Sequence, residues 1–143
     1  MKALFLTFHG FHATNGISKK IHYQVRALEA NGVETHLCYL SEKQGIKYRM
    51  LDQEILADYG DGIKGKLYKR FEFNSVFRYI IKNQIDLVYI RSDHNANPFT
   101  IRLVRKIKKA GAAAYANAPV LHQKADELPV DPAAWVVHHL FNL

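Results

Sequence analysis

The amino-acid sequence predicts an α/β protein, in which a Rossmann-like, doubly wound parallel sheet lies between helices in three layers, α/β/α. Two observations carry this prediction. Residues 3–40 read as a strand, a loop, an amphipathic helix and a second strand, which is the βαβ unit of a parallel sheet. A second apolar run, at 85–90, is followed by a basic helix that opens at Pro98, so the alternation continues along the chain.

The first βαβ unit can be justified element by element. Ala3–Phe8 is a continuous apolar run with one threonine, as expected for a strand that is buried on both faces. Between Ile17 and Leu28, apolar residues recur at helical spacing, and Gly32 supplies a stop signal after that helix. Val33–Leu40 is rich in β-branched and aromatic residues and is predicted to be the second strand.

The later elements follow the same reasoning, with a less regular middle. Residues 41–66 are polar with scattered glycines, and Met50–Asp58 is predicted to contain a short helix. A helical pattern runs over Phe71–Gln84, and Ala112–Ala116 is a weak fourth strand. Asp131-Pro132 is predicted to start a final helix, which continues through Leu140.

Length and composition predict one domain, 1–143, because 143 residues with 48% hydrophobic and 23% charged residues are typical of one globular unit. A single cysteine excludes an intrachain disulfide framework and indicates a cytoplasmic setting. The formal net charge of +7 favours an anionic partner, although ordinary solubilising charge explains it equally well. No pair of histidines has zinc-site spacing with a third ligand nearby, so no metal site is predicted.

The loop after the first strand is the most informative candidate site. Ligands of open parallel sheets bind at the carboxyl ends of the strands, and this rule favours three segments here: 9–16, 41–45 and 91–97. Asn15, Gly16 and Ile17 stand where the next helix begins, and exposed amides at such a helix start suit a phosphate group. The G-x-G-x-x-G and Walker patterns are both missing, which disfavours a dinucleotide enzyme or a P-loop NTPase. Alternatively, Gly16 only eases the turn from strand to helix.

Two loops supply further candidate ligand contacts. His9 and His12 lie in the first loop, and one of them can simply pack against the fold. Arg91, Asp93 and His94 follow the strand at 85–90. An arginine can hold a carboxylate or phosphate with two hydrogen bonds, and the other two side chains can serve as acid or base. The alternative is that this second loop is solvated and caps the following helix.

Basic and aromatic residues alternate in Lys64–Phe71, a composition that could suit nucleic acid or a membrane surface. The alternative is a helix start whose aromatic residues face the core and whose cations face water.

Several segments resemble the N-terminal domain of family-4 glycosyltransferases, which have the GT-B architecture. NGISKK (15–20), QVRAL (24–28) and NGVE (31–34) are similar to the opening loop, helix and strand entry of that family. IDLVYIR (85–91), followed by Pro98 and the basic helix, is similar to a later strand and helix. The resemblance covers residues 1–116, and the remainder of the chain departs from the pattern.

The resemblance implies an acceptor-side half of a two-domain enzyme, whose C-terminal donor domain is absent from these 143 residues, so the chain alone is not expected to transfer sugar. The implied substrates are a nucleotide-sugar and a glycan or lipid-linked acceptor, with no further cofactor and no active-site metal. Gly16 would lie near the donor diphosphate, and Arg91, Asp93 and His94 would face the interdomain cleft. No catalytic residue is identified.

The same resemblance suggests polysaccharide biosynthesis at the inner membrane face, with peripheral membrane contact through the basic surface. Nucleic acid is not expected as a partner in this interpretation. The competing hypothesis is a stand-alone α/β module that binds an anionic ligand or nucleic acid, which the net charge of +7 and the missing donor domain both favour.

Overall fold

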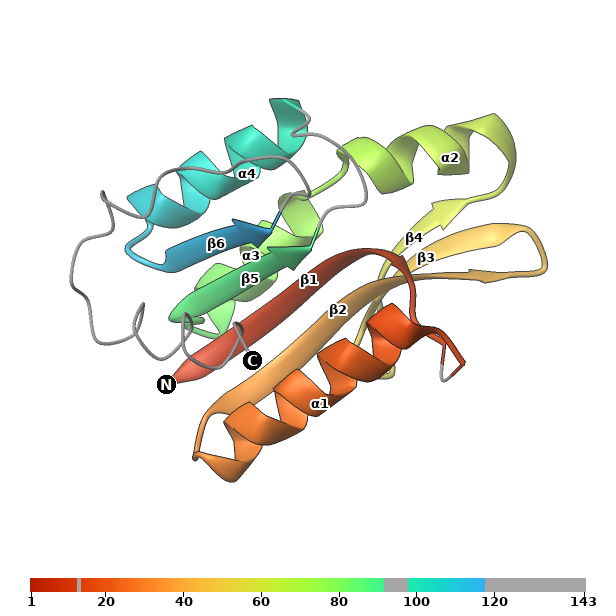
Figure 1. The fold of residues 1–143 in the computed structure, drawn as a ribbon. Coiled ribbons are helices and arrows are strands. Elements are labelled where there is room, and N and C mark those ends of the chain that lie inside the picture. Colours follow the sequence, from red (N-terminus) through yellow and green to blue (C-terminus); the bar gives the residue numbers. More distant parts are fainter. Residues whose placement is uncertain (13, 92–97, 118–143) are drawn as a thin grey trace.

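The computed structural model describes residues 1–12, 14–91 and 98–117, and these form one sheet with helices packed against it (Figure 1). The elements in chain order are β1 (Lys2–Gly10), α1 (Gly16–Ala30), β2 (Glu34–Lys43), β3 (Ile46–Leu51), β4 (Glu54–Gly60), α2 (Gly62–Phe71), α3 (Asn74–Lys82), β5 (Leu87–Arg91), α4 (Pro98–Lys109) and β6 (Ala113–Asn117). None of the helices in this described part is long and apolar enough to cross a membrane.

The sheet has the strand order β4-β3-β2-β1-β5-β6. The pairs β1–β2, β1–β5 and β5–β6 are parallel, whereas β2–β3 and β3–β4 are antiparallel. The predicted α/β class is therefore confirmed, but the sheet is mixed and not parallel throughout. The reason is local: β2, β3 and β4 are joined by connections too short for the crossover that a parallel pair needs.

Apolar side chains of the central strands point alternately to the two faces of the sheet, as the pleat requires. Leu4 and Leu6 of β1 belong to a core cluster with residues of α3 and α4. Ala3 and Phe5 belong to a second cluster with Ile21 and other residues of α1. The central strands are thus buried on both sides, in agreement with the uninterrupted apolar run that predicted β1.

The predicted βαβ unit is confirmed over 2–43. Asn15 caps α1, since its Oδ1 accepts a hydrogen bond of 2.9 Å from the Ile17 amide. Gly32 follows that helix with φ +77°, a conformation that favours glycine. The strand at 85–90, the helix that opens at Pro98 and the weak strand at 112–116 are confirmed as β5, α4 and β6. The helix predicted at 131–140 lies outside the described residues.

The helix predicted over Met50–Asp58 is wrong, because this segment forms most of the β3–β4 hairpin. Asp52 takes φ +54° in the two-residue turn between Leu51 and Glu54. Its Oδ1 accepts a hydrogen bond of 2.8 Å from the Leu37 amide, and this bond ties the hairpin to β2. The apolar spacing that resembled a helix belongs to two strands that are separated by this turn.

The helical pattern at 71–84 corresponds to α3, which is preceded by a separate helix, α2, over the basic-aromatic segment. The alternative that its aromatic residues face the core is wrong. Tyr68 is 57% exposed and Phe71 is 42% exposed, and no residue of α2 belongs to either apolar core cluster.

Candidate functional site

The regular pairing of β1 with β2 breaks where β1 ends. Leu6 pairs with Cys38, but the next paired residues are Gly10 and Leu40. β1 therefore advances by four residues while β2 advances by two, which marks a bulge over residues 7–9. Bulges re-aim side chains and end regular pairing, and here the irregularity separates the carboxyl ends of the two strands.

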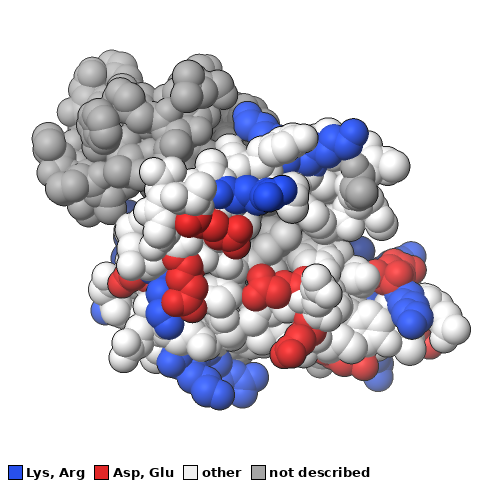
Figure 2. Space-filling model, turned by 90° about the horizontal axis from the view of Figure 1, so that it is seen from below, with Lys and Arg blue, Asp and Glu red and all other residues white. Residues whose placement is uncertain are grey.

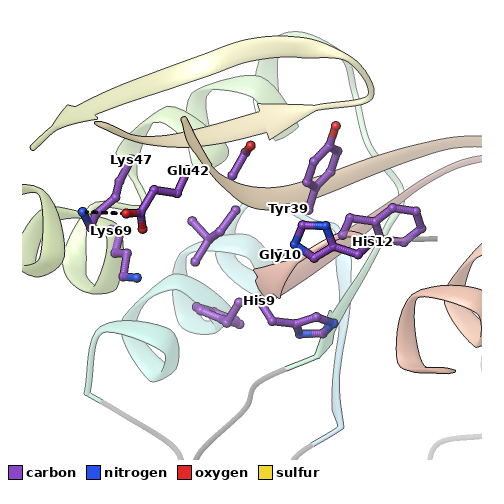
Figure 3. A pocket seen from close by; sticks show the side chains of 11 residues that line it. His9, Gly10, His12, Tyr39, Glu42, Lys47 and Lys69 are labelled. Carbon is purple, nitrogen blue, oxygen red and sulfur yellow. Dashed lines mark ion pairs between the residues drawn. The ribbon is translucent and has the colours of Figure 1, made fainter. Parts of the chain in front are cut away.

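A pocket of about 370 Å³ opens at these carboxyl ends (Figure 3). Its walls come from the end of β1 and the residues after it, from β2, and from β3 and α2. The lining residues are Phe8, His9, Gly10, Phe11, His12, Tyr39, Leu40, Ser41, Glu42, Lys47 and Lys69. The position agrees with the rule that ligands of open α/β sheets bind at the carboxyl ends of the parallel strands.

The two predicted histidines of the first loop both line this pocket. His9 is half-buried at the end of β1, and His12 is exposed in the loop that follows. A Cβ on Gly10 would lie 3.0 Å from His12 Nε2, so glycine lets the imidazole approach the strand end closely. The His12 amide donates a hydrogen bond of 3.1 Å to Ser18 Oγ, which fixes this loop against α1. Two imidazoles are therefore held at one pocket wall.

Two lysines from later elements give the pocket its charge. Lys47 of β3 is only 5% exposed, and its Nζ donates a hydrogen bond of 2.9 Å to the Gly45 carbonyl oxygen. The same Nζ lies 3.6 Å from Glu42 Oε1 (Figure 3). Lys69 of α2 reaches the pocket beside them. Glu42 is the single acidic residue among the lining residues, and its charge offsets that of Lys47, so Lys69 supplies the excess positive charge that favours an anionic ligand.

Tyr39 lines the pocket on the same side as His12 (Figure 3). Its ring packs against Phe11 with 5.6 Å between the centroids. Partial burial and the nearby negative charge of Asp52 raise the pKa of Tyr39 above its ordinary value, so the phenol keeps its proton at neutral pH. A protonated phenol can donate a hydrogen bond to a ligand oxygen.

The predicted phosphate-binding residues Asn15, Gly16 and Ile17 lie at the start of α1 and do not line the pocket. All three are exposed. A Cβ on Gly16 would meet nothing within 4 Å, and Gly16 does not have a positive φ, so the fold itself does not require glycine there. The bend between β1 and α1 is thus open to approach from outside.

The remaining predicted site residues follow β5. Arg91 is half-buried at the end of that strand, where it pairs with Thr7, and it does not line the pocket. Asp93 and His94 lie outside the described residues. In the part of the chain that the structure describes, no three His, Cys, Asp or Glu side chains are grouped so as to hold a metal ion.

Sequence reasoning did not name Tyr39, Glu42, Lys47 or Lys69 individually as site residues. Glu42 lies in the segment 41–45 that the strand-end rule favours, and Tyr39 stands at the end of the strand before it. Lys69 belongs to the basic and aromatic segment 64–71, whereas Lys47 carries no signal, since the hairpin brings it to the pocket only in three dimensions. Comparisons of the chain with protein-family models, with curated proteins and with solved structures found no match.

Proposed function

We propose that this chain is the N-terminal, acceptor-side domain of a glycosyltransferase with GT-B architecture, and that its pocket receives a phosphate-bearing substrate group. One observation carries the proposal. A pocket that contains Lys47, Lys69, His9 and His12 lies at the carboxyl ends of the parallel strands β1 and β2. The open start of α1, with Gly16, follows the same loop.

The proposal includes a Rossmann-like, doubly wound core with three layers. The parallel order β2-β1-β5-β6 supports it, as does the packing of α1 on one sheet face and of α3 and α4 on the other. In this interpretation the β3–β4 hairpin is an addition beside β2, and it supplies Lys47 to the pocket.

The role proposed for each group follows from its chemistry. The lysines attract a phosphate, and an imidazole of His9 or His12 accepts a hydrogen bond from a sugar hydroxyl. The amide of Gly16, at the exposed start of α1, is proposed to meet a diphosphate held by a second domain. The Ile17 amide is already bonded to Asn15 Oδ1, so it is not given this role.

The test is an amide chemical-shift titration of the chain with inorganic phosphate, with UDP-glucose and with GDP-mannose. We expect the nucleotide-sugars to shift resonances of residues 9–12, 15–17 and 39–42 more than phosphate alone does. Gly16→Ala and Lys69→Gln should weaken the response, whereas Lys82→Gln on α3 should not. Equal responses to phosphate and to the nucleotide-sugars, or shifts that avoid these residues, would contradict the proposal.

A stand-alone module for an anionic ligand is the second candidate, and the excess of lysine over glutamate in the pocket favours it. A single-stranded RNA oligonucleotide separates the two candidates. If RNA binds more tightly than the nucleotide-sugars, and the logarithm of its affinity falls linearly with that of salt concentration, the second candidate is correct.

A further inference from the structure

We propose that α2 and the adjoining start of α4 form a surface that docks onto membranes containing anionic phospholipid. We call it the outer surface of α2, and it consists of Ile63, Leu67 and Phe71, the neighbouring Phe99 of α4, and the cations beside them. The proposal does not rest on the glycosyltransferase proposal, because none of these four apolar residues lines the pocket between β1 and β2.

α2 is attached to the sheet by its backbone. Gly65 is its buried residue, and a Cβ at this position would overlap the carbonyl group of Gly60. Arg49 of β3 reaches α2 as well, since its Nη2 donates a hydrogen bond of 3.1 Å to the Lys69 carbonyl oxygen. No side chain of α2 takes part in either apolar core cluster. The apolar side chains of this helix therefore lie outside the apolar core.

Those apolar side chains form a stripe along the outside. Ile63 is 77% exposed, Leu67 is 50% exposed and Phe71 is 42% exposed. At about 100° per residue, positions spaced by four fall within about 80° of one another, on the side of the helix away from Gly65. Single exposed apolar residues are common, but a continuous stripe on the solvent side of a helix indicates an interaction surface.

The stripe continues onto α4. The rings of Phe71 and Phe99 lie with centroids 4.5 Å apart, where α2 ends and α4 begins. A groove of about 380 Å³ adjoins this contact, and Phe77, Arg102 and Lys106 are among its lining residues. Figure 1 shows α2 and α4 along the same upper side of the molecule. The apolar stripe and the groove thus belong to one face.

The two helices carry charge of one sign. α2 contains Lys64, Lys66 and Arg70, besides Lys69 at the pocket, and α4 contains five further lysines and arginines. Neither helix contains an acidic residue, and Asp61 precedes α2. Figure 2 views the molecule from below, away from the upper side on which Figure 1 shows α2 and α4. On that lower side, acidic side chains lie among basic ones. A surface that combines exposed apolar residues with cations is complementary to an anionic membrane, because the cations attract the headgroups and the apolar groups enter the interface.

The exposed aliphatic side chains favour a lipid membrane over a nucleic acid as the partner of this surface. Single-stranded nucleic acid is bound by aromatic rings that stack on bases and by cations that contact phosphates. Ile63 and Leu67 can do neither, yet they are the centre of the stripe. Insertion into the acyl region of a lipid interface removes such side chains from water, and this favours the membrane.

The experiment measures co-sedimentation of the full chain with vesicles of phosphatidylcholine alone and of phosphatidylcholine mixed with phosphatidylglycerol. We expect binding to the mixed vesicles that weakens as salt is added. Ile63→Gln with Leu67→Gln should reduce the affinity at least about tenfold. Lys64→Glu with Lys66→Glu should reduce it by about tenfold or more.

Matched controls keep the test specific. Ile81→Gln replaces an isoleucine of α3 that is 48% exposed, and Lys19→Glu with Lys20→Glu makes the same charge change on α1. Both controls should retain most of the binding, and circular dichroism checks that every variant is folded. The proposal fails if the chain does not bind mixed vesicles, or if the α1 charge variant loses as much binding as the α2 variant. It also fails if single-stranded RNA binds more tightly than vesicles and the Ile63 and Leu67 substitutions leave RNA binding unchanged.

Discussion

The Nε group of Arg49 donates a hydrogen bond of 2.8 Å to the hydroxyl oxygen of Tyr59 in the interior of the protein. The Arg49 side chain is fully buried, and its guanidinium also lies 5.4 Å from the centroid of the Phe73 ring. The Tyr59 hydroxyl lies 3.3 Å from Glu72 Oε2, to which it can donate in turn. A buried cation is thereby linked through a neutral phenol to a carboxylate.

Tyr59→Phe should lower the free energy of unfolding by about 1–3 kcal/mol, because it leaves the buried Arg49 Nε without its acceptor. Urea unfolding of the wild type and the variant measures the difference. Tyr68→Phe is the matched control, since Tyr68 is 57% exposed, and we expect it to change stability by less than about 0.5 kcal/mol. Equal effects of the two substitutions would show that the buried hydrogen bond contributes little.

Gly65→Ala should destabilise the fold, although alanine is normally preferred in a helix by about 1 kcal/mol. The added methyl group would overlap the Gly60 carbonyl group, which is backbone and cannot move as a side-chain end can. We expect a loss of about 1–3 kcal/mol. Gly16→Ala provides the comparison, because a Cβ there meets nothing within 4 Å, and it should leave the thermal midpoint unchanged or raise it.

Asp52→Ala should cost about 1–3 kcal/mol, because it leaves the Leu37 amide without the carboxylate oxygen that accepts its hydrogen bond. Alanine also fits poorly at φ +54°. Asp52→Asn keeps an acceptor oxygen and tolerates this conformation, so it should be much milder. Denaturant unfolding of the two variants measures how much of the effect comes from the geometry of residue 52 and how much from its charge. A larger loss of unfolding free energy for Asp52→Asn than for Asp52→Ala would contradict the role given to the acceptor oxygen.

Burial raises the pKa of the Cys38 thiol from 9.0 to about 11. The thiol should therefore react slowly with a thiol reagent at pH 8 in the folded protein and rapidly in urea. Because the unfolded state releases this proton at lower pH than the folded state, stability is kept below pH 9. It should fall by about 2 kcal/mol as the pH rises from 9 to 11, and by slightly under about 3 kcal/mol once the pH is well above 11.

Cys38→Ala removes the thiol while the tyrosines remain, so its stability should fall less steeply over the same pH range. Urea unfolding at pH 8, 9 and 10 gives the two slopes. If the variant and the wild type lose stability in parallel, the Cys38 thiol is not the group responsible.

The sequence was sufficient to predict β1, α1, β2, β5, α4 and β6, because their apolar residues are the ones that the fold buries. Leu4 and Phe5 are inside, and Gly32 follows α1 with a positive φ. The β3–β4 hairpin was missed because the buried face of β3 presents Lys47 and Arg49, so that the usual relation between charge and exposure is reversed. The partners of Arg49 are Tyr59 on β4 and the Lys69 carbonyl oxygen on α2, whereas Lys47 is bonded to Gly45 and lies near Glu42, which are close in the sequence.

The residues of the candidate site also divide into some that the sequence could predict and others that it could not. His9 and His12 could be predicted to lie at the pocket, because they stand at and after the carboxyl end of a strand of an α/β sheet. Lys47 could not, because it comes from the missed hairpin. Lys69 belongs to the basic and aromatic segment 64–71, which the sequence does not connect with the loop after β1. The bulge over residues 7–9 has no counterpart in the hydrophobic pattern.

The backbone contact between Gly65 and Gly60 has a consequence for how this protein can change over time. Because α2 is held by main-chain atoms, residues on its solvent side are released from selection for folding. Their identities can drift or be re-engineered almost independently of thermodynamic stability. The segment is therefore suited to evolve new recognition properties while the architecture beneath it stays the same.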